Sequence, residues 1–182
     1  TTVAVCRQPA RNTSSVTVTL TISGYLRTTR AAPRRVTRLN WSAMRGVQLR
    51  LGETLWNSGT AVTLDGGDIG NIHPKDKKTV GERLARLALA RAYGRSIVEA
   101  GPIPLSAGLT AKGVEVVFKN AAGLRPADGK QLKGFQLAGT DGKFTYVDAK
   151  AAAGTAVLAV PAGMKPVRVR YAWDGSPNAN LI

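Results

Sequence analysis

Residues 60–94 read TAVTLDGGDIGNIHPKDKKTVGERLARLALARAYG, and this stretch decides the fold of the chain. Its first five residues, Thr60–Leu64, form an apolar run between glycine-containing turns, which predicts a buried parallel strand. A loop rich in glycine and aspartate follows and presents His73, the only histidine of the protein. Leucines and alanines at helical spacing over 79–93 then predict a helix. In α/β enzymes, a strand, a loop with an acid and a histidine, and a covering helix present a catalytic imidazole at the edge of a sheet.

Both ends of the helix predicted over 79–93 carry the expected signals. Thr79 with Glu82 three residues later matches a capping box, and Gly94 suits the left-handed residue beyond the last turn. The helix is apolar on two faces, which predicts that other segments cover it from two sides. Its arginines are predicted to be solvated: Arg83, Arg86 and Arg91.

Two segments of this stretch, IHPKDKKTVGERLA (72–85) and ALARAYG (88–94), carry a family resemblance. They closely resemble the closing block of the sialate O-acetylesterase-like carbohydrate esterases of the SGNH hydrolase superfamily. The likeness extends over about residues 41–182, including LKGFQLAGTDGKF (132–144) and VRYAWDGSPNANLI (169–182), and residues 1–40 show none. The resemblance implies a secreted or periplasmic enzyme that removes acetyl groups from sugar hydroxyls through an acyl-serine intermediate, with no cofactor.

The same resemblance assigns roles to the residues of the loop. It makes His73 the general base, and it makes Asp68 or Asp65 the carboxylate that orients the imidazole. In the superfamily this aspartate stands three residues before the histidine, a position that Gly70 occupies here. Both Asp65 and Asp68 therefore remain candidates for the orienting carboxylate. Asp68 is preferred because Asp65, at the end of the predicted strand, is suited to capping a turn.

The serine nucleophile that this chemistry needs has no recognisable motif in the chain. Serine directly precedes glycine at Ser23 and at Ser58, but neither lies in a Gly-x-Ser-x-Gly elbow or in the motif of the esterases. A base without its nucleophile contributes little, because the members of a triad act as a unit. We therefore expect a truncated esterase that is weakly active or inactive alone, unless another chain supplies the serine.

Basic residues are concentrated in the first part of the chain. The net charge is +15, and residues 1–52 hold nine arginines and no acidic residue. Arginine-rich segments neutralise phosphates, but Tyr25 is the only aromatic side chain of residues 1–40 that could stack on a base, which disfavours nucleic acid as a partner. The run Ser15–Ser23 (SVTVTLTIS) alternates apolar and hydroxyl side chains and predicts a strand.

Several classes of site are not supported by the sequence. One histidine, the single cysteine Cys6 and scattered acids give no spacing for a metal ion, and one cysteine excludes an internal disulfide. No apolar run approaches the roughly 20 residues of a membrane span. Metal, cofactor and membrane are therefore absent from the predicted partners.

The remaining signals divide the chain into a basic segment (1–40), the C-terminal part of an α/β hydrolase domain (41–98) and a β-sandwich domain (99–182). A helix is predicted over 41–55, and Glu99–Leu105, with two prolines and a glycine, is a predicted linker. The predicted fold class is α+β, in which a remnant of an SGNH-type α/β domain precedes an antiparallel β-sandwich. Five alternating runs predict the strands of this sandwich: Gly113–Lys119, Phe135–Ala138, Phe144–Val147, Thr155–Val160 and Val167–Trp173.

The β-sandwich also supports a second class of function, a non-catalytic carbohydrate-binding β-module. Tyr146, Tyr171 and Trp173 could form a platform on which sugar rings stack, although Tyr171 and Trp173 are expected on one strand face, and such residues more often fill a core. An acetylated carbohydrate is the predicted partner of the esterase. A homo-oligomer is also predicted, because an unpaired strand at Thr60–Leu64 would expose a sheet edge, unless SVTVTLTIS replaces the missing neighbours.

Overall fold

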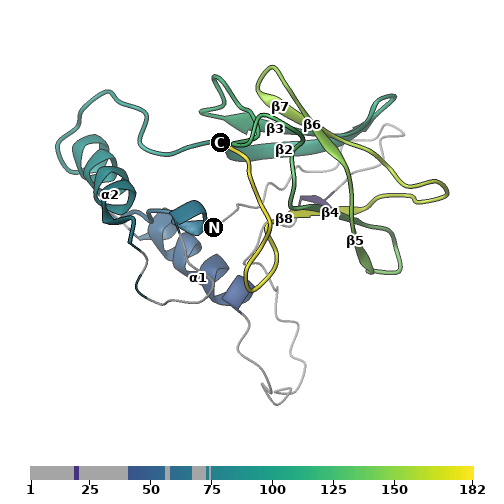
Figure 1. Ribbon diagram of the computed structural model, residues 1–182, viewed down its shortest axis with the longest axis horizontal. Coiled ribbons are helices and arrows are strands. Elements are labelled where there is room, and N and C mark those ends of the chain that lie inside the picture. Colours follow the sequence, from purple (N-terminus) through teal and green to yellow (C-terminus); the bar gives the residue numbers. More distant parts are fainter. Residues whose placement is uncertain (1–18, 21–40, 56–57, 67–72, 74) are drawn as a thin grey trace, which may run out of the picture.

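The computed structural model describes residues 19–20, 41–55, 58–66, 73 and 75–182, and within them the chain forms two α-helices and two β-sheets (Figure 1). This described part of the protein has a mixed α+β fold, as the sequence predicts. The helical elements are α1 (Trp41–Thr54), the 3-10 turn η1 (Leu64–Gly66) and α2 (Lys77–Arg91). The strands are β1 (Thr19–Leu20), β2 (Ile103–Thr110), β3 (Gly113–Lys119), β4 (Phe135–Ala138), β5 (Phe144–Tyr146), β6 (Ala149–Ala152), β7 (Thr155–Leu158) and β8 (Arg168–Tyr171).

The helix predicted over 79–93 is confirmed as α2, but it begins two residues earlier than predicted. Asp76 is its N-cap, and the Asp76 carboxylate accepts a hydrogen bond from the Thr79 backbone N–H at 3.0 Å. The predicted capping box at Thr79 is therefore wrong, because an aspartate three residues earlier already satisfies this N–H. Gly94 has a φ of +63°, in agreement with its predicted left-handed conformation beyond the last turn.

The helix predicted over 41–55 is confirmed as α1, and Arg91 of α2 holds its C-terminal end. The Arg91 guanidinium donates to the backbone carbonyls of Gly52, at 2.8 Å, and Ser58, and forms a two-pronged ion pair with Glu99 at 2.7 and 2.8 Å. Gly52 is needed here, since a Cβ atom at this position would lie 2.2 Å from the Thr60 hydroxyl oxygen. Arg91 is exposed, as predicted, but it also joins both helices to the segment that leads to β2, which was not predicted.

The strand predicted at Thr60–Leu64 is not formed. Residues 58–63 have no regular secondary structure, and Leu64 begins the turn η1. A parallel strand needs neighbours that satisfy its backbone groups, and within the described residues both sheets are built by other segments. Hydrogen bonds between side chains and backbone hold this segment instead. Thr60 Oγ1 donates to the Gln48 carbonyl at 3.0 Å, and Arg83 Nη1 donates to the Val62 carbonyl at 2.5 Å.

The strands form two four-stranded sheets, a first sheet in the order β1-β8-β4-β5 and a second sheet in the order β2-β3-β7-β6. All neighbouring strands are antiparallel except β1 and β8, which are parallel. The five predicted strands are confirmed as β3, β4, β5, β7 and β8, and β5, β7 and β8 are shorter than predicted. The described residues of the predicted N-terminal strand, Thr19 and Leu20, pair with Arg168 and Val169 of β8, and its other residues lie outside the described part of the chain.

Two strands were not predicted from the sequence. The first is β2, which occupies part of the predicted linker Glu99–Leu105 and contains Pro104. It lies at the edge of the second sheet, where proline does not interrupt a ladder, and its register shifts between Pro104 and Ser106. The second is β6, whose sequence AKAA has no β-branched or aromatic residue to signal a strand.

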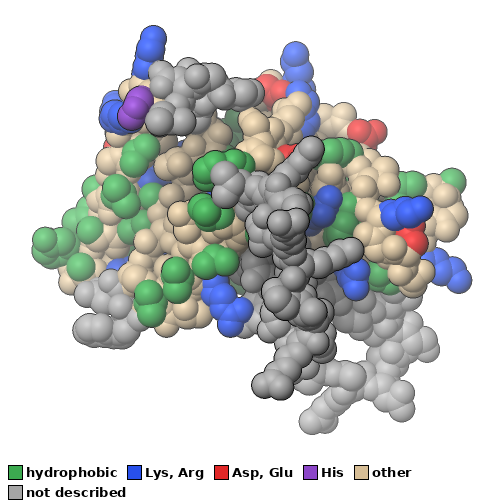
Figure 2. Space-filling view, turned by 90° about the horizontal axis from the view of Figure 1, so that it is seen from below, with side chains coloured by type: hydrophobic (Ala, Val, Ile, Leu, Met, Phe, Trp, Pro, Cys, Tyr) green, Lys and Arg blue, Asp and Glu red, His purple; other side chains and the backbone are tan. Residues whose placement is uncertain are grey.

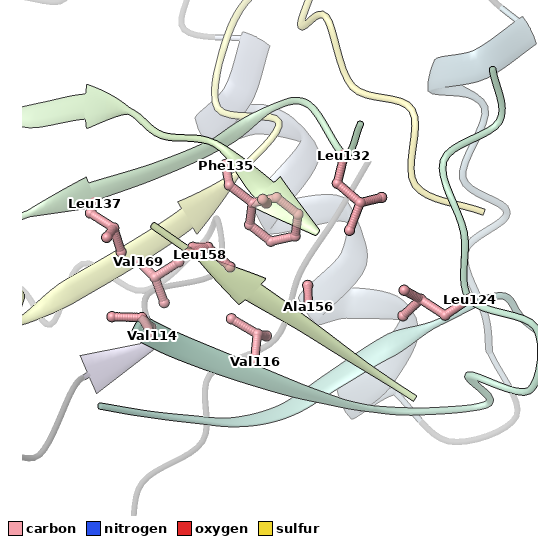
Figure 3. Packing of buried hydrophobic residues seen from close by; sticks show 10 residues of the cluster. Val114, Val116, Leu124, Leu132, Phe135, Leu137, Ala156, Leu158 and Val169 are labelled. Atoms are coloured by element: carbon pink, nitrogen blue, oxygen red, sulfur yellow. The ribbon is translucent and has the colours of Figure 1, made fainter. Parts of the chain in front are cut away.

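The facing sides of the two sheets share one hydrophobic core (Figure 3). Phe135 and Leu137 of β4 and Val169 of β8 point from the first sheet into this core, and each is at most 2% exposed. The second sheet and the connecting loops supply the other side chains drawn and labelled in Figure 3: Val114, Val116, Leu124, Leu132, Ala156 and Leu158. Burial of these side chains is the main contribution of the sheets to stability.

Tyr171 and Trp173 lie on opposite faces of the first sheet, so their predicted placement on one face is wrong. The Tyr171 ring packs on Phe135 in the core, 4.6 Å between ring centroids, and burial raises the pKa of the Tyr171 hydroxyl to about 12. Ala172 then adopts a φ of +52°, which breaks the alternation of side chains along β8. Trp173 is thereby turned to the outer face, where its ring lies 5.8 Å from the guanidinium of Arg170.

Candidate active site around His73

The segment before His73 is fixed by an ion pair between Asp65 in the turn η1 and Arg83 on α2. The two Asp65 carboxylate oxygens accept hydrogen bonds from Arg83 Nη1 at 2.6 Å and from Nη2 at 2.5 Å. Such bidentate ion pairs restrict the relative orientation of the two side chains more than a single hydrogen bond does. Arg83 Nη1 also donates to the Val62 carbonyl, so one guanidinium holds the whole turn against α2. The prediction that Arg83 is solvated is therefore wrong.

This pair also determines the charge on the Asp65 side chain. The hydrogen bonds from Arg83 hold the pKa of the Asp65 carboxyl below its usual value, and the same bonds raise the pKa of Arg83. Asp65 is therefore ionised at neutral pH, but its charge is already balanced by a guanidinium. A carboxylate engaged in this way is less suited to stabilise an imidazolium than a carboxylate without a cation beside it.

We expect replacement of Asp65 by asparagine to destabilise the protein by about 1 kcal/mol at neutral pH, since the pair is bidentate but its side chains are 34% and 48% exposed. The pKa of Asp65 is lowered in the folded state, so this stabilisation is present above the unfolded pKa of about 3.9 and is lost as pH falls through the folded value. Urea unfolding of both proteins at neutral pH and below about pH 3 measures this.

The exposed pair between Lys78 and Glu82, at 3.8 Å, provides the control. Glu82→Gln should change stability by no more than about 0.3 kcal/mol at either pH. A structural role for the Asp65–Arg83 pair would be contradicted if Asp65→Asn and Glu82→Gln lowered the free energy of unfolding equally, or if the loss of stability in Asp65→Asn persisted in acid.

His73 lies four residues before the start of α2, and its side chain is exposed. Figure 2 shows the only histidine of the chain at the surface of the molecule, beside basic side chains. Asp68, the preferred orienting acid, falls outside the described residues. Asp76, three residues after His73, is the N-cap of α2, and the hydrogen bonds from Thr79 lower its pKa. Of the acids near His73, Asp65 and Asp76 thus each have a structural role.

Ser58, one of the two serines that precede glycine, is used to end a helix. Its hydroxyl donates to the Leu55 carbonyl at 2.8 Å and to the Leu51 carbonyl at 3.2 Å, at the C-terminal end of α1. The Leu51 carbonyl also accepts from the Leu55 backbone N–H at 3.0 Å, so the bond to the Leu55 carbonyl is the one by which Ser58 supplies a partner beyond the helix end. Ser23, the other serine before a glycine, lies outside the described residues. The geometry therefore makes Ser58 a capping residue.

The described part of the chain offers neither a metal site nor a membrane-spanning helix. Within the described residues, no group of three or more His, Cys, Asp and Glu side chains could hold a metal ion. Among these residues, no helix has both the length and the apolar character needed to cross a membrane. What the described site offers is an exposed imidazole between an acidic turn and the start of a helix.

These features define a mixed α+β protein in which a segment with one histidine is attached to two core-sharing sheets. Among solved structures, the chain is similar to a carbohydrate acetylesterase from Xanthomonas citri, with a TM-score of 0.64 and 34% sequence identity. The similarity covers 69% of this chain and 29% of the acetylesterase. No family model and no curated protein matches the chain. The structural match, at this identity, relates the chain to the carbohydrate esterases, and the chain spans about 29% of the length of that enzyme.

Proposed function

We propose that the chain is the C-terminal part of a serine-type carbohydrate acetylesterase that hydrolyses acetyl esters on sialate-like sugars. The observation that supports this most directly is the similarity, at 34% identity, to the acetylesterase from Xanthomonas citri. In this proposal, residues 41–98 are the C-terminal part of an SGNH-type α/β hydrolase domain, and residues 99–182 are a β-sandwich domain. Residues 1–40 form a basic segment, of which Thr19 and Leu20 pair with β8.

His73 acts as the general base of this reaction. Its Nε2 atom accepts the proton of a serine hydroxyl as the serine oxygen attacks the acetyl carbonyl. The imidazolium then gives this proton to the sugar oxygen as the ester bond breaks, which leaves an acetyl-serine. Water, deprotonated by the same imidazole, then attacks the acetyl-serine; acetate is released as the imidazolium returns the proton to the serine oxygen. The exposure of His73 supports this role, since a base must be reached by a substrate.

Asp68 orients the imidazole through its Nδ1 atom, and Asp65 positions the loop. The two-pronged pair with Arg83 supports this division, because it engages both oxygens of Asp65. An orienting carboxylate fixes the tautomer of the base and stabilises its protonated form. Asp65 keeps the start of the loop on α2, which carries Arg83, and thereby determines where His73 can lie.

The serine comes from the part of the hydrolase domain that this chain does not contain. Two observations support this: the sequence has no nucleophile elbow, and the Ser58 hydroxyl donates its hydrogen bond to a backbone carbonyl at the end of α1. The surface of the helices provides a place for the rest of the domain. Figure 2 shows apolar side chains gathered over this end of the molecule. The exposed apolar residues of the two helices, together with the residue that follows α1, are Trp41, Met44, Val47, Leu51, Leu55, Leu84 and Leu89.

Complementation tests the proposal. The purified chain is assayed with nitrophenyl acetate alone and after mixing with the segment of the Xanthomonas citri acetylesterase that lies outside the matched 29%. We expect weak or no turnover by either part and a rate at least about 100-fold higher for the mixture, since a base and a nucleophile act only as a unit. A mixture no faster than its two parts, in material that elutes as a complex, would count against the proposal.

A further inference from the structure

The face of the first sheet that points away from the core carries a row of polar and aromatic side chains. Tyr146 of β5 pairs with Gln136 of β4, and Gln136 pairs with Arg170 of β8. Directly opposite residues of paired strands project to the same side of a sheet. Since Phe135 and Leu137 point into the core, Gln136 between them points outward, and Tyr146 and Arg170 point outward with it.

Arg170 lies on β8, an inner strand of this sheet, and its guanidinium is near two aromatic rings. Its guanidinium carbon is 3.8 Å from the centroid of the Phe144 ring and 5.8 Å from that of the Trp173 ring. Its Nε atom donates to the side-chain oxygen of Gln136, which is 5% exposed. Among the residues that the structure describes, no carboxylate forms an ion pair with Arg170. The guanidinium is therefore held in place by its neighbours, and its terminal nitrogens still have N–H groups to donate.

The turn that follows β8 is held at the edge of the same face. Arg45 of α1 donates to the backbone carbonyls of Ala172 and Gly175, both at 3.3 Å, and to that of Asp174. Tyr146 donates its hydroxyl proton to the Asp174 carboxylate. Ala172 is kept at a positive φ of 52°, a backbone conformation that costs free energy for any residue other than glycine and that persists only where contacts enforce it. The result is that Trp173 and Asp174 stand beside Tyr146 and Arg170.

We propose that Tyr146, Trp173, Arg170 and Asp174 form a binding surface for a neutral sugar ring. The apolar C–H face of a pyranose packs on an aromatic ring, and the Tyr146 side chain is 54% exposed. The hydroxyl groups of such a ring both donate and accept, which suits a surface that carries both a guanidinium and a carboxylate. Because Asp174 offsets the charge of Arg170, the surface favours a neutral sugar over an acidic one.

This surface is distinct from the loop of His73. In Figure 1, β5 lies at the opposite end of the molecule from α2, the helix that follows His73. The choice of a carbohydrate as the ligand rests on the proposed function, whereas the position of the surface rests on the contacts described above. The surface would hold a polysaccharide while the esterase site acts on its acetyl groups.

Affinity electrophoresis of the purified protein tests the inference. The gels contain xylan, galactomannan or mixed-linkage β-glucan, which are neutral, or polygalacturonate, which is acidic. We expect at least one neutral polysaccharide to retard the protein, and Tyr146→Ala to weaken that binding roughly tenfold through loss of ring stacking. Tyr146→Phe keeps the ring and should stay within about threefold of the original protein. Tyr93→Ala removes a tyrosine that is 73% exposed beyond the end of α2, and it should bind unchanged.

The outcomes separate this inference from the proposed function. Retardation by a neutral polysaccharide that Tyr146→Ala weakens and His73→Ala leaves intact supports the surface, whether or not esters are hydrolysed. Ester hydrolysis without retardation that depends on Tyr146 overturns the surface alone. Retardation by polygalacturonate only, equal in all variants and lost in salt, also overturns it, because a net charge of +15 would then account for the binding.

Discussion

Replacement of His73 by alanine is expected to lower kcat/KM for acetyl ester hydrolysis by about three orders of magnitude in the complemented enzyme. Without the imidazole, the serine proton has no acceptor during attack on the carbonyl, and the leaving sugar oxygen has no donor. His73 is the only histidine of the chain, so no second imidazole within it can replace the first. Steady-state hydrolysis of nitrophenyl acetate at neutral pH measures the loss.

Two aspartate variants sharpen this result. Asp68→Asn should also lower kcat by two to four orders of magnitude, roughly as loss of an orienting carboxylate does, with little change in KM. Asp65→Asn should lower it by less than about tenfold, because the Asp65 carboxylate is paired with Arg83. Lys75→Ala, which alters an exposed side chain near His73, serves as the control and should leave kcat unchanged.

The order of these effects decides between the two carboxylates. If Asp65→Asn costs more activity than Asp68→Asn while the protein stays folded, Asp65 is the orienting acid and its pair with Arg83 must open during the reaction. If His73→Ala retains the original rate, the esterase proposal fails for this chain. Circular dichroism of each variant distinguishes lost chemistry from lost structure.

The helices and most strands of the protein could be predicted from local sequence. α1 and α2 follow from apolar spacing, and Gly94 follows from the need for a left-handed residue at the helix end. The same kind of signal fails at Thr60–Leu64, where the apolar run predicts a strand. An apolar pattern shows that a segment can be buried in a sheet, but the neighbouring strands must be supplied by other parts of the sequence.

Long-range contacts account for the parts of the site that the sequence did not show. Arg83 and Arg91 stand on a helix surface where most arginines are solvated, and their roles come from carbonyls and carboxylates that only the folded chain brings near. On the outer face of the first sheet, Tyr146 and Trp173 could be named from the sequence as part of a platform for sugar rings, but Arg170 and Asp174 were missed for a similar reason. Strict alternation along β8 places Trp173 with Tyr171, and the positive φ of Ala172 that separates them leaves no mark in the sequence.

Replacement of Gly113 by alanine is expected to destabilise the protein by about 3 kcal/mol or more, because backbone strain and overpacking each cost 1–3 kcal/mol. Gly113 begins β3 with a φ of +126°, which a residue with a Cβ atom rarely adopts. A Cβ atom there would lie 2.2 Å from the carbonyl oxygen of Leu158 on the neighbouring strand β7. Both strands carry core residues at this point, since Val114 and Leu158 are fully buried.

Gly108 on β2 provides a matched control for this substitution. It lies in the same hairpin, opposite Glu115 of β3, and a Cβ atom added to it would meet no heavy atom within 4 Å. Gly108→Ala should therefore leave the free energy of unfolding unchanged or raise it by up to about 1 kcal/mol, because alanine restricts the unfolded chain.

Urea unfolding of the two variants against the original protein tests the comparison. For a chain of 182 residues, a loss of 3 kcal/mol corresponds to a fall in Tm of roughly 6–12 °C, which a thermal scan also resolves. Similar losses in both variants would mean that any alanine in the hairpin is harmful, and the close approach of β3 to Leu158 would then not be the cause. A loss confined to Gly113→Ala would show that this approach fixes the start of β3, and through it the register of the sheet that faces β4 and β8.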